Sequence, residues 1–186
     1  VKVGTGLLNN HWTFDARLSN IGTDGYIDRA SVDLNSYYLQ GGYFAENTSV
    51  KLIAFAGKEK TYHAWGYATK KEMEDFGRRY NPCGEMYTDA NGNKHFYDDQ
   101  TDNYLQKNYQ LLFNHTFSTA WNLNVALHYT KGDGYYEEYK DGRSLIEYGL
   151  KPFTIDGTEI TKSDLVRQKK MDNKFGGGVF SLNYTV

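Results

Sequence analysis

One histidine of the chain lies in a cluster of aromatic residues within a predicted loop. The aromatic neighbours of His63 are Tyr62, Trp65 and Tyr67. Rings of these types can stack on flat ligands, and an imidazole can also bind a metal or carry a proton. The other histidines are scattered. His115 and His128 fall on neighbouring predicted strands with opposite parity, so they face opposite ways and cannot share a metal.

Two acidic stretches have features of cation-binding loops. Residues 89–93 (DANGN) match the start of a calcium loop, but Lys94 replaces the required glycine and Gln100 the required glutamate. A hairpin turn is the preferred interpretation there. Asp98, Asp99 and Asp102 could coordinate a hard cation, although a plain solvated acidic turn already explains them. We therefore predict no metal site.

No arrangement typical of an enzyme can be assembled from the remaining residues. Residues 3–9 (VGTGLLN) begin like a dinucleotide fingerprint, but Asn9 replaces the third glycine and a tight turn follows instead of a helix. There is no nucleophile elbow, zinc-binding pair or Cys/His constellation with suitable spacing. The sequence thus predicts no catalytic residue, no cofactor and no enzymatic activity.

The composition argues against a nucleic-acid binder and is compatible with a membrane β-barrel. The net charge is −2, whereas a nucleic-acid-binding surface normally needs a basic excess. Aromatic residues make up 16% of the chain, yet all hydrophobic residues together reach only 39%. Such a Tyr-rich chain suits a barrel with a polar lumen and aromatic rims, but a secreted sandwich or a carbohydrate-binding module has similar numbers. Cys83 is the single cysteine, so an internal disulfide is excluded.

Apolar and polar residues alternate with a period of two over several stretches, which predicts strands with two unlike faces. The clearest stretches are 12–19, 108–117, 121–130 and 179–186, and weaker ones lie near 31–44 and 49–57. The opening residues 1–8 are expected to form the end of one more strand. The prediction is an all-β fold of about seven antiparallel up-and-down strands, forming one domain over residues 1–186.

The predicted connections alternate strictly between short and long. Tight turns are expected at 9–11, 46–48 and 118–120, and long links at 22–30, 58–103 and 132–171. In a meander this order gathers all tight turns at one end of the sheet and all long loops at the other, as in outer-membrane barrels. Trp12, Phe117 and Trp121 fall at the tight-turn end, where an aromatic girdle would lie.

Local structure is also expected inside the long loops. Residues 69–79 (TKKEMEDFGRR) favour a short helix with ion pairs at i,i+4 spacing. Asn91-Gly92 predicts a two-residue hairpin turn, and 155–158 predicts another. Because single-chain barrels of this type have an even number of strands, an odd, open set indicates an internal fragment of a larger barrel.

Several stretches together resemble the barrel region of TonB-dependent outer-membrane receptors of the Bacteroidetes type. The resemblance covers nearly the whole chain, and the stretches that carry it are 60–65 (KTYHAW), 79–85 (RYNPCGE), 97–104 (YDDQTDNY), 121–132 (WNLNVALHYTKG) and 134–140 (GYYEEYK). The resemblance implies a barrel of about 22 strands in the bacterial outer membrane, with extracellular loops near 58–103 and 132–171. It also implies a plug domain and TonB as partners outside this segment, and import of a scarce nutrient such as a ferric siderophore, haem or cobalamin.

The resemblance also assigns the faces of the strands. It implies that Trp12, Phe14, Leu111, Phe113, Leu123, Val125 and Leu127 contact outer-membrane lipid. It also implies that a second set of residues faces the lumen, namely Asp15, Arg17, Asn108, Gln110, Asn122 and Asn124.

The long loops would then capture a small-molecule or glycan ligand. The aromatic candidates for stacking are Tyr62, His63, Trp65 and Tyr67. The basic candidates for attracting an anionic ferric complex are Lys58, Lys60, Lys70, Lys71, Arg78 and Arg79. The alternative is that the aromatics form the extracellular girdle and the basic residues pair with lipopolysaccharide or with nearby acids.

Two other functions remain open from the sequence. One is a passive porin-type barrel without TonB coupling. The other is a soluble β-rich carbohydrate-binding module, whose apolar faces would have to meet in one core.

Overall fold

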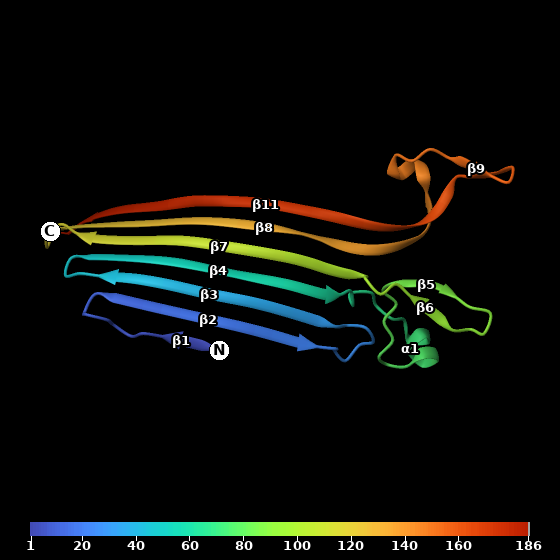
Figure 1. Cartoon of the computed structure of the whole chain (residues 1–186), viewed down its shortest axis with the longest axis horizontal. Helices are drawn as coiled ribbons and strands as arrows, with labels where there is room; N and C mark the ends of the chain where they lie inside the picture. The colour runs from blue at the N-terminus through green and yellow to red at the C-terminus, as the bar shows by residue number, and fades with distance from the viewer. Residues whose placement is uncertain (186) are drawn as a thin grey trace.

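A single antiparallel sheet dominates the computed structural model, which describes residues 1–185. Its strands follow one another in chain order, β1-β2-β3-β4-β7-β8-β11, and every neighbouring pair is antiparallel. Six long strands lie side by side, with the short β1 at one edge (Figure 1). The predicted all-β fold and its up-and-down order are confirmed.

Two small hairpins and two short helical segments complete the fold. The strands of the large sheet are β1 (Lys2–Gly4), β2 (Trp12–Thr23), β3 (Val32–Phe44), β4 (Thr48–Tyr62), β7 (Thr101–Thr116), β8 (Trp121–Ser144) and β11 (Lys162–Tyr184). The remaining elements are α1 (Lys70–Phe76), β5 (Glu85–Thr88), β6 (Lys94–Phe96), the 3-10 helix η1 (Leu145–Tyr148), β9 (Phe153–Ile155) and β10 (Thr158–Ile160).

The short and long connections are sorted to opposite ends of the sheet, as the sequence predicts. The turns after β1, β3 and β7 lie together at one end, and α1 and both hairpins lie at the other (Figure 1). Asn9 and Asn10 both have positive φ, and the His11 amide donates to the Leu8 carbonyl over 2.9 Å. Leu8 pairs with Trp12 in both directions, so residues 9–11 form a three-residue hairpin loop, at the position predicted for a tight turn.

Two of the long connections are shorter than predicted. The 58–103 link shrinks to 63–100 and the 132–171 link to 145–161, because β4, β7, β8 and β11 all run further than their alternation suggests. Beyond the alternating part the strands remain hydrogen-bonded, while polar residues are mixed with aromatic and aliphatic ones on both faces. Backbone pairing needs no apolar face, so hydrophobic periodicity cannot mark where such a strand ends.

The local elements of the loops agree with prediction in kind and differ in detail. Helix α1 begins after Thr69, whose side chain forms a capping box with Glu72. The β9–β10 hairpin turns through Asp156 and Gly157, both with positive φ. The β5–β6 hairpin also exists, but Thr88 pairs with Lys94, so its loop covers 89–93 and is longer than the predicted two-residue turn.

The strand register places the residues predicted to share a face on the same face. Directly opposed residues point the same way, and Phe14, Gly41, Leu52, Leu111, Leu127 and Gly178 form one continuous row across six strands. The row beside it on the other face is Asp15, Gln40, Ile53, Gln110, His128 and Gly177. His115 and His128 accordingly lie on opposite faces, as expected.

The buried side chains gather at the loop end and not along the sheet. In the described part of the chain the two most deeply buried side chains, His63 and Asn81, belong to this end, and Ala56 and Glu138 are the buried side chains that lie inside long strands. Large apolar side chains such as Leu52, Phe14 and Phe180 stay exposed on the sheet. The sheet does not close within residues 1–185, so β1 and β11 are free edges. None of the helices described is both long and apolar enough to cross a membrane.

Candidate ligand-binding surface of the loop cap

The segment between β4 and β7 folds onto the end of the sheet and forms a compact unit. We call this unit the loop cap and define it as residues 24–31 and 63–100. Tyr62 anchors it from the last position of β4, because its buried hydroxyl donates to the Tyr97 carbonyl over 2.8 Å. Burial raises the pKa of this phenol, with Arg29 opposing the shift. Tyr62 is therefore a support of the cap and does not offer a face to a ligand.

Asn81 is the central hydrogen-bonding residue of the loop cap and is 1% exposed. Its side-chain amide donates to the carbonyls of His63 (2.9 Å) and Asp28 (3.1 Å), and its side-chain oxygen accepts from the Cys83 amide (3.0 Å). Its own carbonyl accepts from the Arg29 guanidinium, which lies 3.4 Å from the centre of the Phe96 ring. Asn81 thus joins three segments that are distant in the sequence.

His63 is buried at the junction of the cap with the sheet. Its ring stacks on Trp65 with 3.8 Å between centroids, and its Nε2 lies 3.7 Å from the Asp102 carboxylate on β7. Neither ring nitrogen has a hydrogen-bond partner within residues 1–185. Burial lowers the pKa of the imidazole, and the Asp102 and Glu138 carboxylates oppose that shift. His63 is 1% exposed, so it supports Trp65 from behind.

Trp65 and Tyr67 are the predicted aromatics that do face solvent. Trp65 is 58% exposed and Tyr67 is 95% exposed. Because the inner face of Trp65 is held by His63, its outer face is presented in a fixed orientation. A rigid indole face suits stacking on a planar or sugar ring.

Most of the predicted basic residues form ion pairs with nearby carboxylates. On α1, Lys71 pairs with Asp75 at 2.6 Å and Lys70 with Glu74 at 3.8 Å. Arg79 pairs with Asp28 at 3.2 Å, which ties the two parts of the cap together. Lys60 pairs with Asp99 on the sheet side. These ion pairs match the alternative in which the basic residues bind neighbouring carboxylates.

Lys58 and Arg78 are the two basic candidates outside the ion pairs recorded for the described residues. Lys58 lies on β4, in the row of Asn35 and Leu105, and Arg78 is exposed after α1. Four of the six predicted basic residues are thus paired with carboxylates, and the other two lie on different parts of the chain.

Several contacts of the cap with β8 were not predicted from the sequence. Tyr97 donates to the Glu137 carboxylate, and the Gln100 side-chain oxygen accepts from the Tyr139 amide over 2.8 Å. Glu138 is buried and pairs with Arg167 and with Lys140. The run of Tyr and Glu at 135–139 is the sequence feature that could have pointed to these contacts, but it does not indicate which segment the residues would contact.

The acidic loop residues form turns instead of grouping as ligands. The Asp89 carboxylate accepts from the amides of Asn91 (2.9 Å) and Asn93 (2.8 Å). Hydrogen bonds from Asn93 and His95 lower the pKa of Asp89 to about 2. In the part of the chain that is described, no three His, Cys, Asp or Glu side chains are grouped so that they could hold a metal ion.

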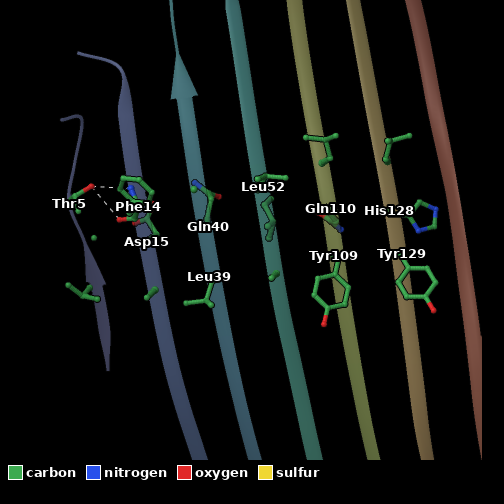
Figure 2. A pocket seen from close by; sticks show the side chains of 18 residues that line it. Thr5, Phe14, Asp15, Leu39, Gln40, Leu52, Tyr109, Gln110, His128 and Tyr129 are labelled. Atoms are coloured by element: carbon green, nitrogen blue, oxygen red, sulfur yellow. Dashed lines mark hydrogen bonds between the residues drawn. The ribbon is translucent and has the colours of Figure 1, made fainter. Parts of the chain in front are cut away.

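A second surface of interest is the apolar face of the sheet. On β8 this face presents Trp121, Leu123, Val125, Leu127 and Tyr129, with no charge until Lys131. A hollow of about 750 Å³ lies over this face, and Figure 2 shows Leu39, Tyr109 and Tyr129 in one row beneath it. Tyr109 and Tyr129 form an aromatic border at the loop side, opposite the predicted border with Trp12, Phe117 and Trp121.

No family model matches the chain, and no curated protein or solved structure is significantly similar to it.

Proposed function

We propose that this chain is a segment of the wall of an outer-membrane β-barrel, and that the barrel belongs to a TonB-dependent receptor that imports a scarce nutrient. Candidate nutrients are a ferric siderophore, haem or cobalamin. The loop cap would lie outside the cell and capture the ligand, and the tight turns would face the periplasm.

The observation that supports this proposal is the uncharged face of the sheet between its two aromatic borders. From Trp121 to Tyr129 the strand is about 27 Å long at about 3.4 Å per residue. The outward apolar band of an outer-membrane barrel is about 25 Å tall and is also bordered by aromatic girdles. Matching rows on the neighbouring strands extend the same band across the sheet.

The opposite face carries many polar side chains, as a lumen wall requires, although Ile53, Phe55 and Leu112 also lie on it. Asn124 accepts a hydrogen bond from Asn114 over 2.6 Å and donates to Asn122 over 2.7 Å. Asn122 in turn donates to Thr116. A soluble module would need to bury the apolar face in a core, yet Leu52, Leu182 and Phe180 remain exposed. The soluble carbohydrate-binding alternative is therefore less well supported.

Free edges also favour a larger barrel. The 23-residue strand β11 pairs only with β8 in the described structure. In the membrane interior every backbone amide and carbonyl needs a partner, so an open edge of this length requires further strands.

The proposal is tested by measuring nutrient uptake in cells that produce the protein containing this chain. Binding and uptake of a ferric siderophore, haem and cobalamin would be followed with TonB present and absent. We expect uptake of one of them to be lost without TonB. Uptake that is independent of TonB would indicate the passive porin-type barrel instead, and recovery of the protein in the soluble fraction would overturn the barrel.

The role of the loop cap is tested by removing its exposed aromatic faces. Replacing both Trp65 and Tyr67 with alanine should weaken ligand binding by about 10- to 100-fold, since each stacked ring contributes roughly 0.5–1.5 kcal/mol beyond its buried area. Tyr87→Ala is the matched control, because Tyr87 is also exposed but stacks on His95 elsewhere in the cap. Equal binding by the control and the double variant would remove Trp65 and Tyr67 from the site.

A further inference from the structure

Three lysines form a row across the apolar face at its boundary with the loop end. Lys107 on β7 pairs directly with Lys131 on β8, and Lys131 pairs with Lys174 on β11. Directly opposed residues point to the same side of a sheet, so all three ammonium groups belong to the apolar face. Like charges placed opposite each other are destabilising unless an anion lies between them.

The row lies immediately beside the apolar hollow. Tyr109 and Tyr129 line the hollow, and Lys107 and Lys131 follow two residues further along the same strands. Two residues correspond to about 7 Å along a strand. On β7, β8 and β11 these lysines are the first charges met when the apolar face is followed from the tight turns towards the loops.

Two of the three lysines have no carboxylate within ion-pair distance. Lys131 lies 3.7 Å from the Asp133 carboxylate, whereas no ion pair involves Lys107 or Lys174 in residues 1–185. Asp133 and Asp172 face each other in the next row outward and therefore lie on the far side of the lysines from the hollow. Along β7, β8 and β11, the apolar face between the tight turns and the lysine row carries no negative charge.

We propose that this face is a binding site for a membrane lipid with an anionic phosphate head group. Its acyl chains occupy the hollow over Leu39, Leu52, Leu111 and Leu127, and its phosphate lies on Lys107, Lys131 and Lys174. The tyrosines at the hollow's edge sit at the level where an aromatic ring meets the head-group region. The inference rests on the proposed function, since it places the apolar face in a membrane.

The test compares lipid selectivity of the protein that contains this chain in vesicles made of equal parts phosphatidylglycerol and phosphatidylcholine. The lipids that remain bound after detergent extraction would be counted by mass spectrometry. We expect the wild type to retain phosphatidylglycerol in preference to phosphatidylcholine. The triple variant Lys107→Gln, Lys131→Gln, Lys174→Gln should lower that preference by about tenfold, because it removes three positive charges whose attraction to the anionic head group is only partly screened by salt.

A control variant with the same change in charge is Lys51→Gln, Lys151→Gln, Lys162→Gln. Lys51 lies on the other face, Lys151 lies in the loop after η1, and Lys162 is the first residue of β11 at the loop end of the sheet, so this variant should keep the wild-type preference. Equal preference in both triple variants would overturn the proposal. A second variant, Ala54→Phe, fills the hollow and should reduce retention of both lipids; undiminished retention would exclude the hollow as the acyl site.

Two further arms separate the possible causes of a result. Inorganic phosphate should displace the lipid no better than chloride at equal ionic strength; stronger displacement would mean a plain anion site and would overturn the lipid proposal. Insertion into the vesicles is scored independently by protection from added protease. Insertion without lipid preference overturns only this inference, whereas failure to insert overturns the proposed function as well.

Discussion

His63 is buried without a hydrogen-bond partner for either ring nitrogen in the described structure. Such a group is costly when charged, and burial accordingly lowers the pKa of the imidazole below its ordinary value of 6.5. The unfolded cap then binds a proton at a pH where the folded cap does not. By linkage, the loop cap is stable above the ordinary pKa and loses stability as the pH falls from about 6.5 towards the lowered value.

We predict that His63→Phe removes this part of the pH dependence. Hydrogen exchange of the Cys83 amide, which Asn81 holds in the centre of the cap, reports its opening. The wild-type amide should exchange faster at pH 5 than the variant amide, after correction for intrinsic rates, and the two should differ little in their pH response above pH 7. A difference between the proteins that stays constant over this range would contradict the prediction.

Gly134 is a residue at which any side chain would meet the neighbouring strand. A Cβ there would lie 2.1 Å from the Asn103 carbonyl oxygen and 2.8 Å from the Tyr104 Cα, both backbone atoms. The β7 and β8 backbones would have to separate to admit a methyl group. Gly57, on β4 at the other side of β7, has no atom within 4 Å of such a Cβ.

We therefore expect Gly134→Ala to lower the free energy of unfolding by about 1–3 kcal/mol, as overpacking commonly does. Gly57→Ala should be neutral or slightly stabilising. Urea denaturation in detergent micelles, followed by tryptophan fluorescence, would measure both. An equal loss of unfolding free energy in the two variants would contradict the prediction, because it would show that the close approach of β7 and β8 at Gly134 does not require glycine.

At the scale of the element, α1 is too short to be stable by itself and depends on its cap. The Glu72 amide donates to the Thr69 hydroxyl over 3.2 Å, and the Thr69 amide donates to the Glu72 carboxylate over 2.7 Å. The helix carries Phe76, whose ring lies 4.9 Å from that of Tyr80. The hydrogen bonds between Thr69 and Glu72 therefore also hold Phe76 in place against Tyr80 within the loop cap.

Thr69→Ala should destabilise α1 by about 1 kcal/mol, the usual cost of losing such a side chain. Hydrogen exchange of the Met73 and Gly77 amides, which bond within the helix, should accelerate about fivefold if the helix opens locally. Glu74→Ala is the control, since Glu74 makes only a 3.8 Å contact with Lys70 at the surface. Exchange that is equally fast in both variants would show that the capping box is not what holds the helix.

Comparison of β8 and the β5–β6 hairpin with their predictions shows which features of an element can be predicted from the sequence. Alternation from Trp121 to Thr130 correctly predicts a strand and its two faces, because one face is apolar there. From Lys131 to Ser144 the same strand continues with polar and aromatic residues on both sides, so the pattern disappears although the pairing persists. Asn91-Gly92 correctly predicts a hairpin, but Asp89 accepts hydrogen bonds from both Asn91 and Asn93 and widens its loop.

The candidate site was predictable only in part, since its interior depends on contacts between distant segments. The aromatic cluster around His63 could be recognised from composition, and Trp65 and Tyr67 are indeed exposed. The burial of Tyr62 and His63 could not be predicted, because it follows from Asn81, Gln100 and Arg29 closing over them from elsewhere in the chain. The Lys107–Lys131–Lys174 row likewise exists only through the register of three strands.

For the whole molecule, the decisive feature is a sheet with one uncharged apolar face and one more polar face, of which few side chains are buried within residues 1–185. In water this apolar face would have to be covered by another layer, whereas in a membrane lipid covers it. The central claim is therefore about the surroundings of the sheet. It predicts that neighbouring residues of β8 lie alternately in lipid and in an aqueous or protein-lined interior.

The most direct measurement is a cysteine scan along β8 in the membrane-inserted protein, in a Cys83→Ser background. A fluorophore would be attached in turn at positions 122 to 127, and its quenching by brominated lipid tails would be compared with quenching by iodide. Lipid quenching should be strong at Leu123, Val125 and Leu127 and weak at Asn122, Asn124 and Ala126. Quenching without this period of two, or iodide access on both faces, would contradict the assignment of this sheet to a membrane barrel.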